Sequence, residues 1–363
     1  MKLNILSLFD GMSCGQQALE RAGIEVDDYF ASEIDKYAIQ VTMANYPDTK
    51  QLGSVVNVNG YDLPKIDLLI GGSPCQSFSF AGKRKGMATK CEAEILTLNH
   101  YLELKADGYE FEGQSYLFWE FMRLLNECKP KYFLLENVEM GEKWEKVLSK
   151  AIGVNGIHIN SSLVSAQNRK RIYWTNIGMQ PGGLFGDLVS IIDKPKDKGI
   201  LLKDVLEAQV DDKYFLSDKM QTWLNKHSLK RGRNPENPKS RKPVLNTEQQ
   251  LEARNDYKTN CLTSVQKDNL VIGGDYRYDE GFRWRDNNKS GTLPARGRSE
   301  GNDFSGQALV SINNQIRRLT PLECERLQTV KDNYTNYVSD SQRYKMLGNG
   351  WTVDVIAHIF KYL

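Results

Sequence analysis

Short apolar runs, each ended by glycine, proline or a polar residue, recur along the first half of the chain. A continuous apolar run of about four to eight residues is typical of a strand that is buried on both faces of a sheet. These runs lie at 4–8, 29–32, 66–70, 131–135 and 172–174, and two glycines end the third run. They predict a mostly parallel sheet, because the buried strands of parallel sheets carry this pattern.

Segments with the apolar spacing of helices lie between and after these runs, at 16–22, 115–127, 321–328 and 353–362. The helix at 321 has a clear start, since Thr320 suits the N-cap, Pro321 the first turn and Glu323 the N3 position of a capping box. Strands that alternate with helices predict the α/β class. We expect a Rossmann-like, mostly parallel sheet with helices on both faces.

Residues 176–312 have a different character, with many Gly, Asn, Asp and Pro residues and little periodic apolar patterning. They predict a smaller, irregular domain inserted into a first domain of residues 1–175 and 313–363. A faint repeat, Lys258–Thr263 against Lys289–Pro294, predicts two similar strand or loop units within the insert.

Composition narrows the class of protein. The chain has 363 residues and 48 Lys and Arg against 46 Asp and Glu, so its net charge of +2 permits a nucleic-acid partner without demonstrating one. No apolar run is long enough to span a membrane, and we expect a first strand rather than a signal peptide from the first residues. The 6 cysteines form no C-x-x-C pair and there are only 4 histidines, so we expect no metal site, and reduced thiols in a cytoplasm.

Reactive side chains follow the predicted strands at their carboxyl ends, where open α/β sheets bind ligands. Cys75 follows the turn Gly72-Ser73-Pro74, and Glu136 follows the fourth run. By itself Cys75 is either an exposed nucleophile or a buried structural thiol, and the local sequence leaves both open. Glu33, after the second run, is placed either to accept hydrogen bonds from a ribose or to lie solvated in a loop.

A row of polar and cationic side chains precedes the fifth run. Gln167, Arg169 and Arg171 alternate, so an extended backbone points them to one side, as a clamp for an anion or base edge or as a solvated basic turn. A thiolate at Cys75 can attack an electron-poor ring carbon, and a buried Glu136 can supply a proton to a ring nitrogen. The arginines can stabilise negative charge on a carbonyl oxygen. These are the requirements for adding a methyl group to carbon 5 of cytosine.

Ordered motifs along the chain strengthen this interpretation. They are Phe9-Asp10-Gly11 with Gly15, Glu33, Gly72-Ser73-Pro74-Cys75-Gln76, Glu136-Asn137-Val138, Gln167-x-Arg169-x-Arg171, Arg318-Leu319-Thr320-Pro321-x-Glu323 and Gly348-Asn349. Each motif is weak alone, but in this order the chain resembles a DNA (cytosine-5)-methyltransferase of the bacterial and phage type. The resemblance covers residues 3–175 and 316–363.

The resemblance implies S-adenosylmethionine as the methyl donor, lying across the strand ends. It places Phe9 near the adenine and Glu33 on the ribose, while Ser54 stands where the family often has Asp at the adenine. The glycine spacing after the first run is not that of a dinucleotide fingerprint. The residues expected to contact the cofactor are Phe9, Asp10, Gly11, Ser13, Gly15, Glu33, Ser54, Val55, Pro74, Asn349 and Trp351.

The resemblance also implies a catalytic set of Cys75, Glu136, Arg169 and Arg171. Cys75 adds to carbon 6 of a cytosine that has left the duplex, and Glu136 engages N3 and the exocyclic amine. Arg169 and Arg171 steady the base and the thiolate region. Methyl transfer to carbon 5 is followed by proton loss and release of Cys75, and the loop after Cys75 is expected to close over the base.

Double-stranded DNA is the partner that the resemblance implies, with residues 176–312 as a target-recognition domain. Thr292 with Leu293, or else Thr263, is expected to support the flipped base. The expected DNA-contacting residues are Gln76, Ser79, Lys83, Arg84, Arg231, Arg233, Thr263, Thr292, Arg296 and Arg298. We expect a cytoplasmic monomer with no membrane partner, bacterial or encoded by a phage in a bacterial host. The target sequence and a cognate restriction endonuclease are left open.

Two other functions compete with this one. A transfer-RNA cytosine methyltransferase of the same fold shares most motifs but has a smaller recognition region, so the insert of roughly 135 residues, about one domain in size, favours duplex DNA. A non-catalytic DNA-binding relative is expected to lack the nucleophile or the glutamate, and Cys75 and Glu136 are both present.

Overall fold

The computed structural model describes most of the first half of the chain and its C-terminal part. The described residues are 2–74, 94–111, 113–182, 187–217, 258–259, 261–262, 270–271, 275–277, 281–283 and 317–363. The chain divides into two compact units, the first made of Met1–Val205, Lys258–Val265 and Pro321–Leu363 and the second of Leu206–Tyr257 and Gln266–Thr320. The insert expected at 176–312 thus supplies residues to both units.

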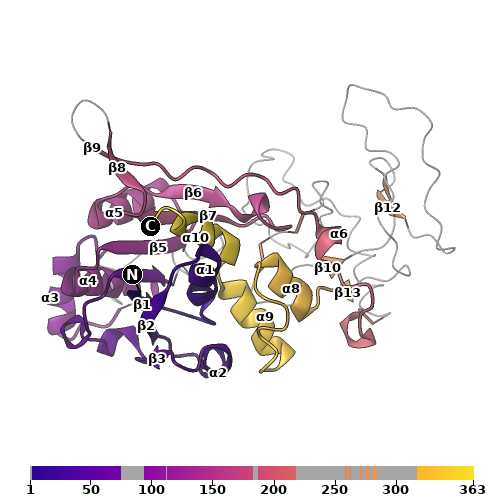
Figure 1. The fold of residues 1–363 in the computed structure, drawn as a ribbon, viewed down its shortest axis with the longest axis horizontal. Helices are drawn as coiled ribbons and strands as arrows, with labels where there is room; N and C mark the ends of the chain where they lie inside the picture. The colour runs from indigo at the N-terminus through magenta and orange to yellow at the C-terminus, as the bar shows by residue number, and fades with distance from the viewer. Residues whose placement is uncertain are drawn as a thin grey trace. The chain divides into compact units, whose positions relative to one another are not determined.

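A seven-stranded sheet forms the centre of the first unit, in the order β3-β2-β1-β4-β5-β7-β6 (Figure 1). Its strands are β1 Leu3–Leu8, β2 Val26–Ser32, β3 Lys50–Gln51, β4 Leu68–Gly72, β5 Tyr132–Val138, β6 Ile157–Asn160 and β7 Lys170–Thr175. Neighbouring strands from β3 to β5 are parallel, whereas β7 is antiparallel to both β5 and β6. The predicted α/β class with a mostly parallel sheet is confirmed.

Helices pack on both faces of this sheet. The helices of the first unit are α1 Cys14–Ala22, α2 Lys36–Asn45, α3 Leu98–Ala106, α4 Phe118–Cys128, α5 Glu142–Ile152, α6 Leu202–Val205, α8 Pro321–Leu327, α9 Asp340–Asn349 and α10 Val353–Phe360. Leu69 of β4 packs in one cluster with α4, whereas a Cβ on Gly15 of α1 would come within 2.6 Å of Ile70. Since neighbouring residues of a strand point to opposite faces, α1 and α4 cover different faces. Helix α10 packs against α1.

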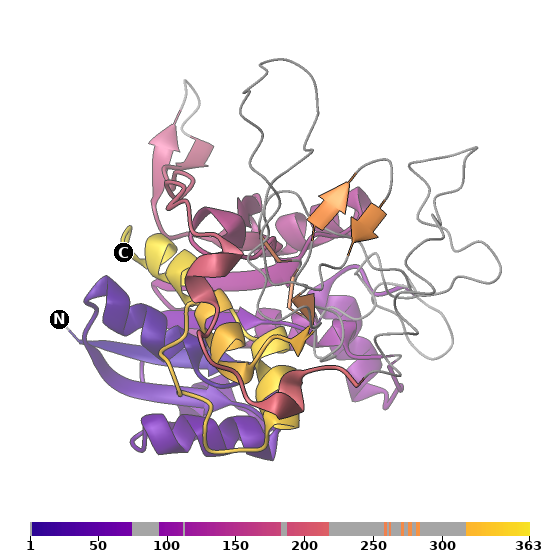
Figure 2. The ribbon, with the colours of Figure 1, turned by 90° about the vertical axis from the view of Figure 1, so that its right-hand side faces the viewer.

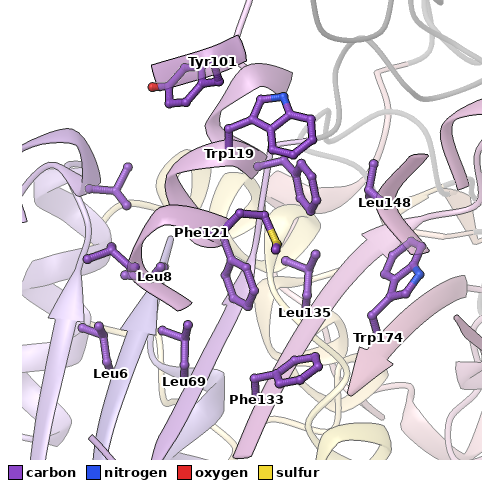
Figure 3. Packing of buried hydrophobic residues seen from close by; sticks show 14 of the residues in the cluster. Leu6, Leu8, Leu69, Tyr101, Trp119, Phe121, Phe133, Leu135, Leu148 and Trp174 are labelled. Atoms are coloured by element: carbon purple, nitrogen blue, oxygen red, sulfur yellow. The ribbon is translucent and has the colours of Figure 1, made fainter. Parts of the chain in front are cut away.

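The main hydrophobic core lies between the sheet and helices α3, α4 and α5 (Figure 3). Leu6 of β1, Leu69 of β4 and Leu135 of β5 are fully buried there. Phe121 and Trp119 of α4 are also fully buried and pack in the same cluster. Burial of one such side chain stabilises the fold by roughly 1.5–3 kcal/mol, so this core fixes the strands whose ends carry the candidate site.

Two predicted strand boundaries differ from the structure. The glycines expected to end the third run continue β4, because Gly71 and Gly72 pair with β5. Gly71 also lies where a Cβ would come within 3.1 Å of Phe121, so its small size permits close packing of α4. Strand β5 continues through Glu136 to Val138, because β7 pairs with it there. Glu136 therefore lies within a strand, where paired neighbours fix its position.

Short strand pairs complete the described structure. They are β8 Met179–Gly182 with β9 Asp187–Ser190, β10 Leu270–Val271 with β13 Arg317–Arg318, and β11 Asp275–Arg277 with β12 Gly281–Arg283. The β8–β9 hairpin projects from the first unit in both views (Figure 2). The predicted C-terminal helices are confirmed as α8 and α10. No described helix has the length and apolar character needed to cross a lipid bilayer.

Candidate active site

The carboxyl ends of β1, β2, β4 and β5 meet at one edge of the sheet, since these strands are parallel. The turn Phe9–Ser13 follows β1, and Glu33 follows β2. Ser73 and Pro74 follow β4, and Glu136 lies near the end of β5. The fold thus brings predicted site residues from four strands to one edge, the usual ligand site of an open α/β sheet.

The turn after β1 has an unusual backbone. Phe9, Gly11 and Ser13 have left-handed backbone angles, with φ of 56, 59 and 57°. Such angles cost a residue other than glycine of order 1–3 kcal/mol, so the surrounding contacts must hold the turn. A Cβ on Gly11 would meet nothing within 4 Å, so glycine is needed here for its backbone freedom, and open space lies beside it.

Glu33 holds this turn to the end of β2. Its Oε2 accepts a hydrogen bond from the Gly11 amide at 2.8 Å. Its Oε1 accepts from the Ile34 and Asp35 amides at 2.7 and 2.8 Å. The side chain of Ile34 is apolar yet 72% exposed, next to the carboxylate. Sequence reasoning missed Ile34, although an apolar residue directly after an acid at a strand end could have indicated it.

Asp10 is bonded to side chains that brace the same turn. Its Oδ1 accepts from the Ser7 hydroxyl at 2.6 Å and the Tyr29 hydroxyl at 2.8 Å, and its Oδ2 accepts from the Ser13 hydroxyl. Burial raises the pKa of Asp10 to about 6, although these hydrogen bonds favour the carboxylate. Gly15 lies where a Cβ would come within 2.8 Å of the Tyr29 hydroxyl. The contacts of Asp10, Ser13 and Gly15 therefore shape the turn from within.

The residues expected at the adenine, Ser54 and Val55, follow a glycine with a left-handed backbone. Gly53 has φ of 71°, and its carbonyl accepts from the Ser32 hydroxyl at 2.8 Å. The side chain of Val55 packs in the main core, and its carbonyl accepts from Arg123 Nη2 at 3.1 Å. Ser54 is the half-buried member of the pair, so Ser54 is the better placed of the two to meet a ligand.

Glu136 is held from two sides. Its Oε1 forms an ion pair with Arg171 Nε at 2.8 Å, and its Oε2 accepts from the Trp351 indole at 3.2 Å. A Cβ on Gly72 would lie 2.8 Å from the Trp351 Nε1 and 3.1 Å from Glu136 Oε2. Gly72 thus leaves the space in which the indole reaches the carboxylate. Asn349, expected at the cofactor, ends α9 and is exposed.

Asn137 ties the end of β5 to the segment that leads to the predicted nucleophile. Its Nδ2 donates to the Ser73 carbonyl at 3.2 Å and to the Ser73 hydroxyl at 3.0 Å. Pro74 follows and is half-buried. Cys75 lies outside the described residues, so its predicted place in the site is not tested by the structure.

Arg169 is buried, with 3% of its surface exposed. Its Nη1 donates to Cys261 Sγ at 2.9 Å and to the carbonyls of Leu262 and Gly348 at 3.2 Å each. Its Nη2 donates to the Gly350 carbonyl at 2.8 Å. Two segments far from Arg169 in the sequence thus provide its hydrogen-bond acceptors.

Cys261 lies between the two arginines, since Arg171 Nη2 is 3.5 Å from its sulfur. Gln167 faces the same segment, because its Oε1 accepts from the Leu262 amide at 3.3 Å. Burial disfavours a thiolate, but Arg169 and Arg171 outweigh it and lower the pKa of Cys261. The alternating row therefore points one way, toward a segment of the same chain. Sequence reasoning missed Cys261 as a site residue, and only the faint repeat singled it out.

The predicted DNA-contacting residues all lie outside the described residues. They are Gln76, Ser79, Lys83, Arg84, Arg231, Arg233, Thr263, Thr292, Arg296 and Arg298. Within the described ranges, no group of His, Cys, Asp and Glu side chains could hold a metal ion. The cysteines of those ranges, Cys14, Cys128, Cys261 and Cys324, form no disulfide with one another.

Solved structures with a similar fold come from methyltransferases. The Entamoeba histolytica methyltransferase EhMeth has a TM-score of 0.61 and 15% identity over 100% of this chain and 98% of its own. The Dnmt2 methyltransferase of S. pombe has a TM-score of 0.59 and 16% identity over 98% and 96%. The chain therefore shares its fold with these two methyltransferases.

Sequence comparison then defines the family. The family model of C-5 cytosine-specific DNA methylases matches residues 3–101 and 105–363, and the chain belongs to this family. The orphan methyltransferase M.SPRI of Bacillus phage SPR is 28% identical over 452 residues, which cover 100% of this chain and 97% of the relative. The type II methyltransferase M1.ScrFI of Lactococcus lactis subsp. cremoris is 27% identical over 98% of this chain and 76% of its own length.

The family assigns the chain its reaction and its cofactor. The predicted enzyme class, a DNA (cytosine-5-)-methyltransferase with S-adenosylmethionine as methyl donor, is confirmed, and the RNA alternative gains no comparable support. The strand ends fit such a cofactor. The open turn at Gly11 lets a ligand approach the backbone, Glu33 offers carboxylate oxygens and Ile34 offers apolar surface.

Proposed function

We propose that this chain methylates carbon 5 of a flipped-out cytosine in a specific sequence of double-stranded DNA, with Cys75 as the nucleophile. The observation that carries this proposal is the fixed side chain of Glu136, which forms an ion pair with Arg171 and accepts a hydrogen bond from the Trp351 indole. Glu136 pairs directly with Gly72 of β4, and β4 leads through Ser73 and Pro74 to Cys75. A nucleophile and an acid on adjacent strand ends match the needs of the reaction.

Each catalytic residue has a distinct role in the proposed steps. The Cys75 thiolate forms a bond to carbon 6 of the base, and the displaced electron pair moves into the ring toward N3, where Glu136 supplies a proton or hydrogen bond. Arg169 and Arg171 stabilise the negative charge that develops on the base. After carbon 5 has gained its methyl group, water accepts the proton of carbon 5, and the electron pair of that bond re-forms the ring double bond while Cys75 leaves carbon 6 as a thiolate.

The cofactor is proposed to lie along the ends of β1 and β2. S-adenosylmethionine supplies an electrophilic methyl group there. Glu33 is placed to accept hydrogen bonds from the ribose with the lone pairs that its backbone donors leave. Phe9 and the exposed Ile34 offer apolar surface for the adenine.

Covalent trapping tests the nucleophile. DNA that contains 5-fluorocytosine should trap the wild-type chain, because fluorine cannot leave carbon 5 as a proton does. The Cys75→Ser variant should keep its fold and give neither adduct nor methyl transfer, since the change is small and the residue serves chemistry. Mass spectrometry of the adduct identifies the attached residue. An adduct that persists in the Cys75→Ser variant contradicts this assignment.

The recognition region is proposed to lie at 176–312, with Thr292 or Thr263 supporting the flipped base and Arg296 and Arg298 contacting base edges. The type II relative M1.ScrFI supports a place in restriction and modification, so a cognate endonuclease is proposed as a partner. We also propose a monomer acting in the cytoplasm of a bacterium or of a phage host. Transfer of a labelled methyl group to DNA and to transfer RNA distinguishes the DNA function from its RNA rival.

A further inference from the structure

The sulfur of Cys261 joins the two candidate catalytic arginines. Arg169 Nη1 and Arg171 Nη2 lie 2.9 and 3.5 Å from it. Cys261 comes from the region expected to read the DNA sequence, about ninety residues after the arginines in the chain. Its contacts therefore link that region to the site of chemistry.

Backbone hydrogen bonds fix the segment that carries Cys261. The Thr259 amide donates to the Ala166 carbonyl at 2.7 Å, and the Asn168 amide donates to the Thr259 carbonyl at 2.8 Å. Thr259 forms a parallel bridge with Gln167, which also accepts from the Leu262 amide. The segment therefore lies alongside residues 166–168, which directly precede β7. Several backbone hydrogen bonds thus fix the position of Cys261 in addition to its own contacts with the arginines.

The charges around Cys261 explain why a hydrogen-bond acceptor is needed between the two arginines. Arg169 and Arg171 are like charges on neighbouring side chains, and one carboxylate, Glu136, pairs with Arg171. Arg169 instead donates to backbone carbonyls and to the sulfur. A buried cation needs satisfied donors to offset the cost of losing water. Both arginines in turn favour the thiolate of Cys261, although burial opposes it.

The contacts of Cys261 belong to a closed ring of side chains. Arg171 connects the sulfur to one oxygen of Glu136, and the Trp351 indole bonds to the other oxygen. Arg169 connects the sulfur to the Gly350 carbonyl, directly before Trp351 in the chain. Loss of the sulfur opens this ring between the two arginines and leaves each guanidinium group with one acceptor fewer, Arg169 on its backbone carbonyls and Arg171 on Glu136.

We propose that Cys261 is a positioning residue of the methyl-transfer site, whose sulfur holds Arg169 and Arg171 and, through Arg171, the carboxylate of Glu136. This role rests on the proposed function of the site. It differs from the role of a nucleophile, because Cys261 acts on the base through the arginines alone. It also gives the expected recognition region a part in catalysis.

Substitution of Cys261 in the full-length chain tests this role by single-turnover methyl transfer to unmethylated DNA. We expect Cys261→Ala to lower the rate about 10- to 100-fold, the scale for loosening a catalytic group, while the apparent affinities for DNA and cofactor barely change. Cys261→Ser keeps an acceptor and should recover part of the rate. The control is Cys128→Ser, a half-buried thiol whose sulfur contacts Gly60, and it should leave the rate unchanged.

A double substitution separates positioning from packing. If Cys261 acts by holding the two arginines, then Cys261→Ala and Arg171→Lys together should lower the rate by less than the product of their single losses, because Arg171→Lys already removes one of the two contacts of the sulfur. Independent, multiplicative losses overturn the proposal, and so does a Cys261→Ala variant as fast as Cys128→Ser. If Cys261→Ala melts early, Cys261→Val decides, because it fills the space without an acceptor, and full wild-type activity of that variant overturns the role. A wild-type chain that methylates no DNA instead overturns the proposed function itself.

Discussion

Replacement of Gly72 by Ala tests whether the space beside Glu136 matters for catalysis. Gly72 lies at the end of β4, before the turn to Cys75. Because it has no side chain, it leaves room for the Trp351 indole to reach Glu136. An added Cβ would lie 2.8 Å from Trp351 Nε1 and 3.1 Å from Glu136 Oε2. These two atoms share a hydrogen bond of 3.2 Å, so the methyl group would press on both of its ends. The indole or the carboxylate must move by several tenths of an ångström to admit it.

The structure sets the size of the expected effect. Overpacking of this kind costs about 1–3 kcal/mol of folding free energy, so the variant should still fold. Displacement of a catalytic group by less than 1 Å can cost up to about 100-fold in rate. We expect the rate of methyl transfer to fall about 10- to 100-fold, equivalent to about 1.4–2.7 kcal/mol in the barrier. Single-turnover transfer from labelled S-adenosylmethionine measures the rate, and thermal melting measures the stability.

Gly141 provides the matched control for this substitution. A Cβ on Gly141 would meet nothing within 4 Å, and its φ of −69° suits alanine. Gly141→Ala should therefore keep the wild-type rate. In a Trp351→Phe background, Gly72→Ala should cost little more, because the nearest atom is gone. Equal rates for the Gly72 and Gly141 variants would refute this reasoning, and a full loss in the Trp351→Phe background would exclude the indole as its cause.

Two further predictions concern charge. The pKa of Asp10 is raised from 3.8 to about 6, so between these two pH values the folded chain binds a proton that the unfolded chain does not. Asp10 therefore contributes stability that is fully present below pH 3.8 and is lost as the pH rises through 6. Denaturation curves should show that the free energy of unfolding falls by about 2–3 kcal/mol between about pH 4 and 7, and that it falls less in Asp10→Asn. If the free energy of unfolding of Asp10→Asn depends on pH as steeply as that of the wild type, Asp10 is not the group responsible. Neutralising Arg231 and Arg233 should weaken binding to unrelated duplexes alike and reduce the slope against log salt by about 2. A loss confined to one DNA sequence would instead assign these arginines to base contacts.

The sequence predicts the central strands and the class of fold well, because buried parallel strands leave continuous apolar runs. Strand β2 was expected at 29–32 and is found at Val26–Ser32. The sequence does not predict that β4 continues through Gly71 and Gly72, because glycine normally indicates a turn. In the structure, the pairing of these glycines with β5 outweighs that tendency. The edge strands β3 and β6 are short, and neither carries an apolar run. Neither strand is among the predicted elements.

The site shows a similar division. Motif spacing brought Glu136, Arg169 and Arg171 forward as candidates, because each residue type has a chemical role near a strand end. Local sequence contains no sign that Cys261 contacts the arginines, since hydrogen bonds between distant segments bring it there. The same holds for the indole of Trp351, which was expected at the cofactor and bonds to Glu136. Contacts between segments far apart in the chain are what sequence patterns omit.

These contacts change how the division of labour between the two regions should be understood. If all residues at 176–312 served recognition alone, that region could be exchanged between relatives without effect on the chemistry. The segment Lys258–Val265 belongs to the first unit, and Cys261 within it holds both arginines. An exchanged region therefore has to supply its own acceptor between Arg169 and Arg171, because a buried guanidinium group such as that of Arg169 tolerates the loss of a partner poorly. Recognition can vary around this segment, whereas the segment itself is part of the catalytic machinery.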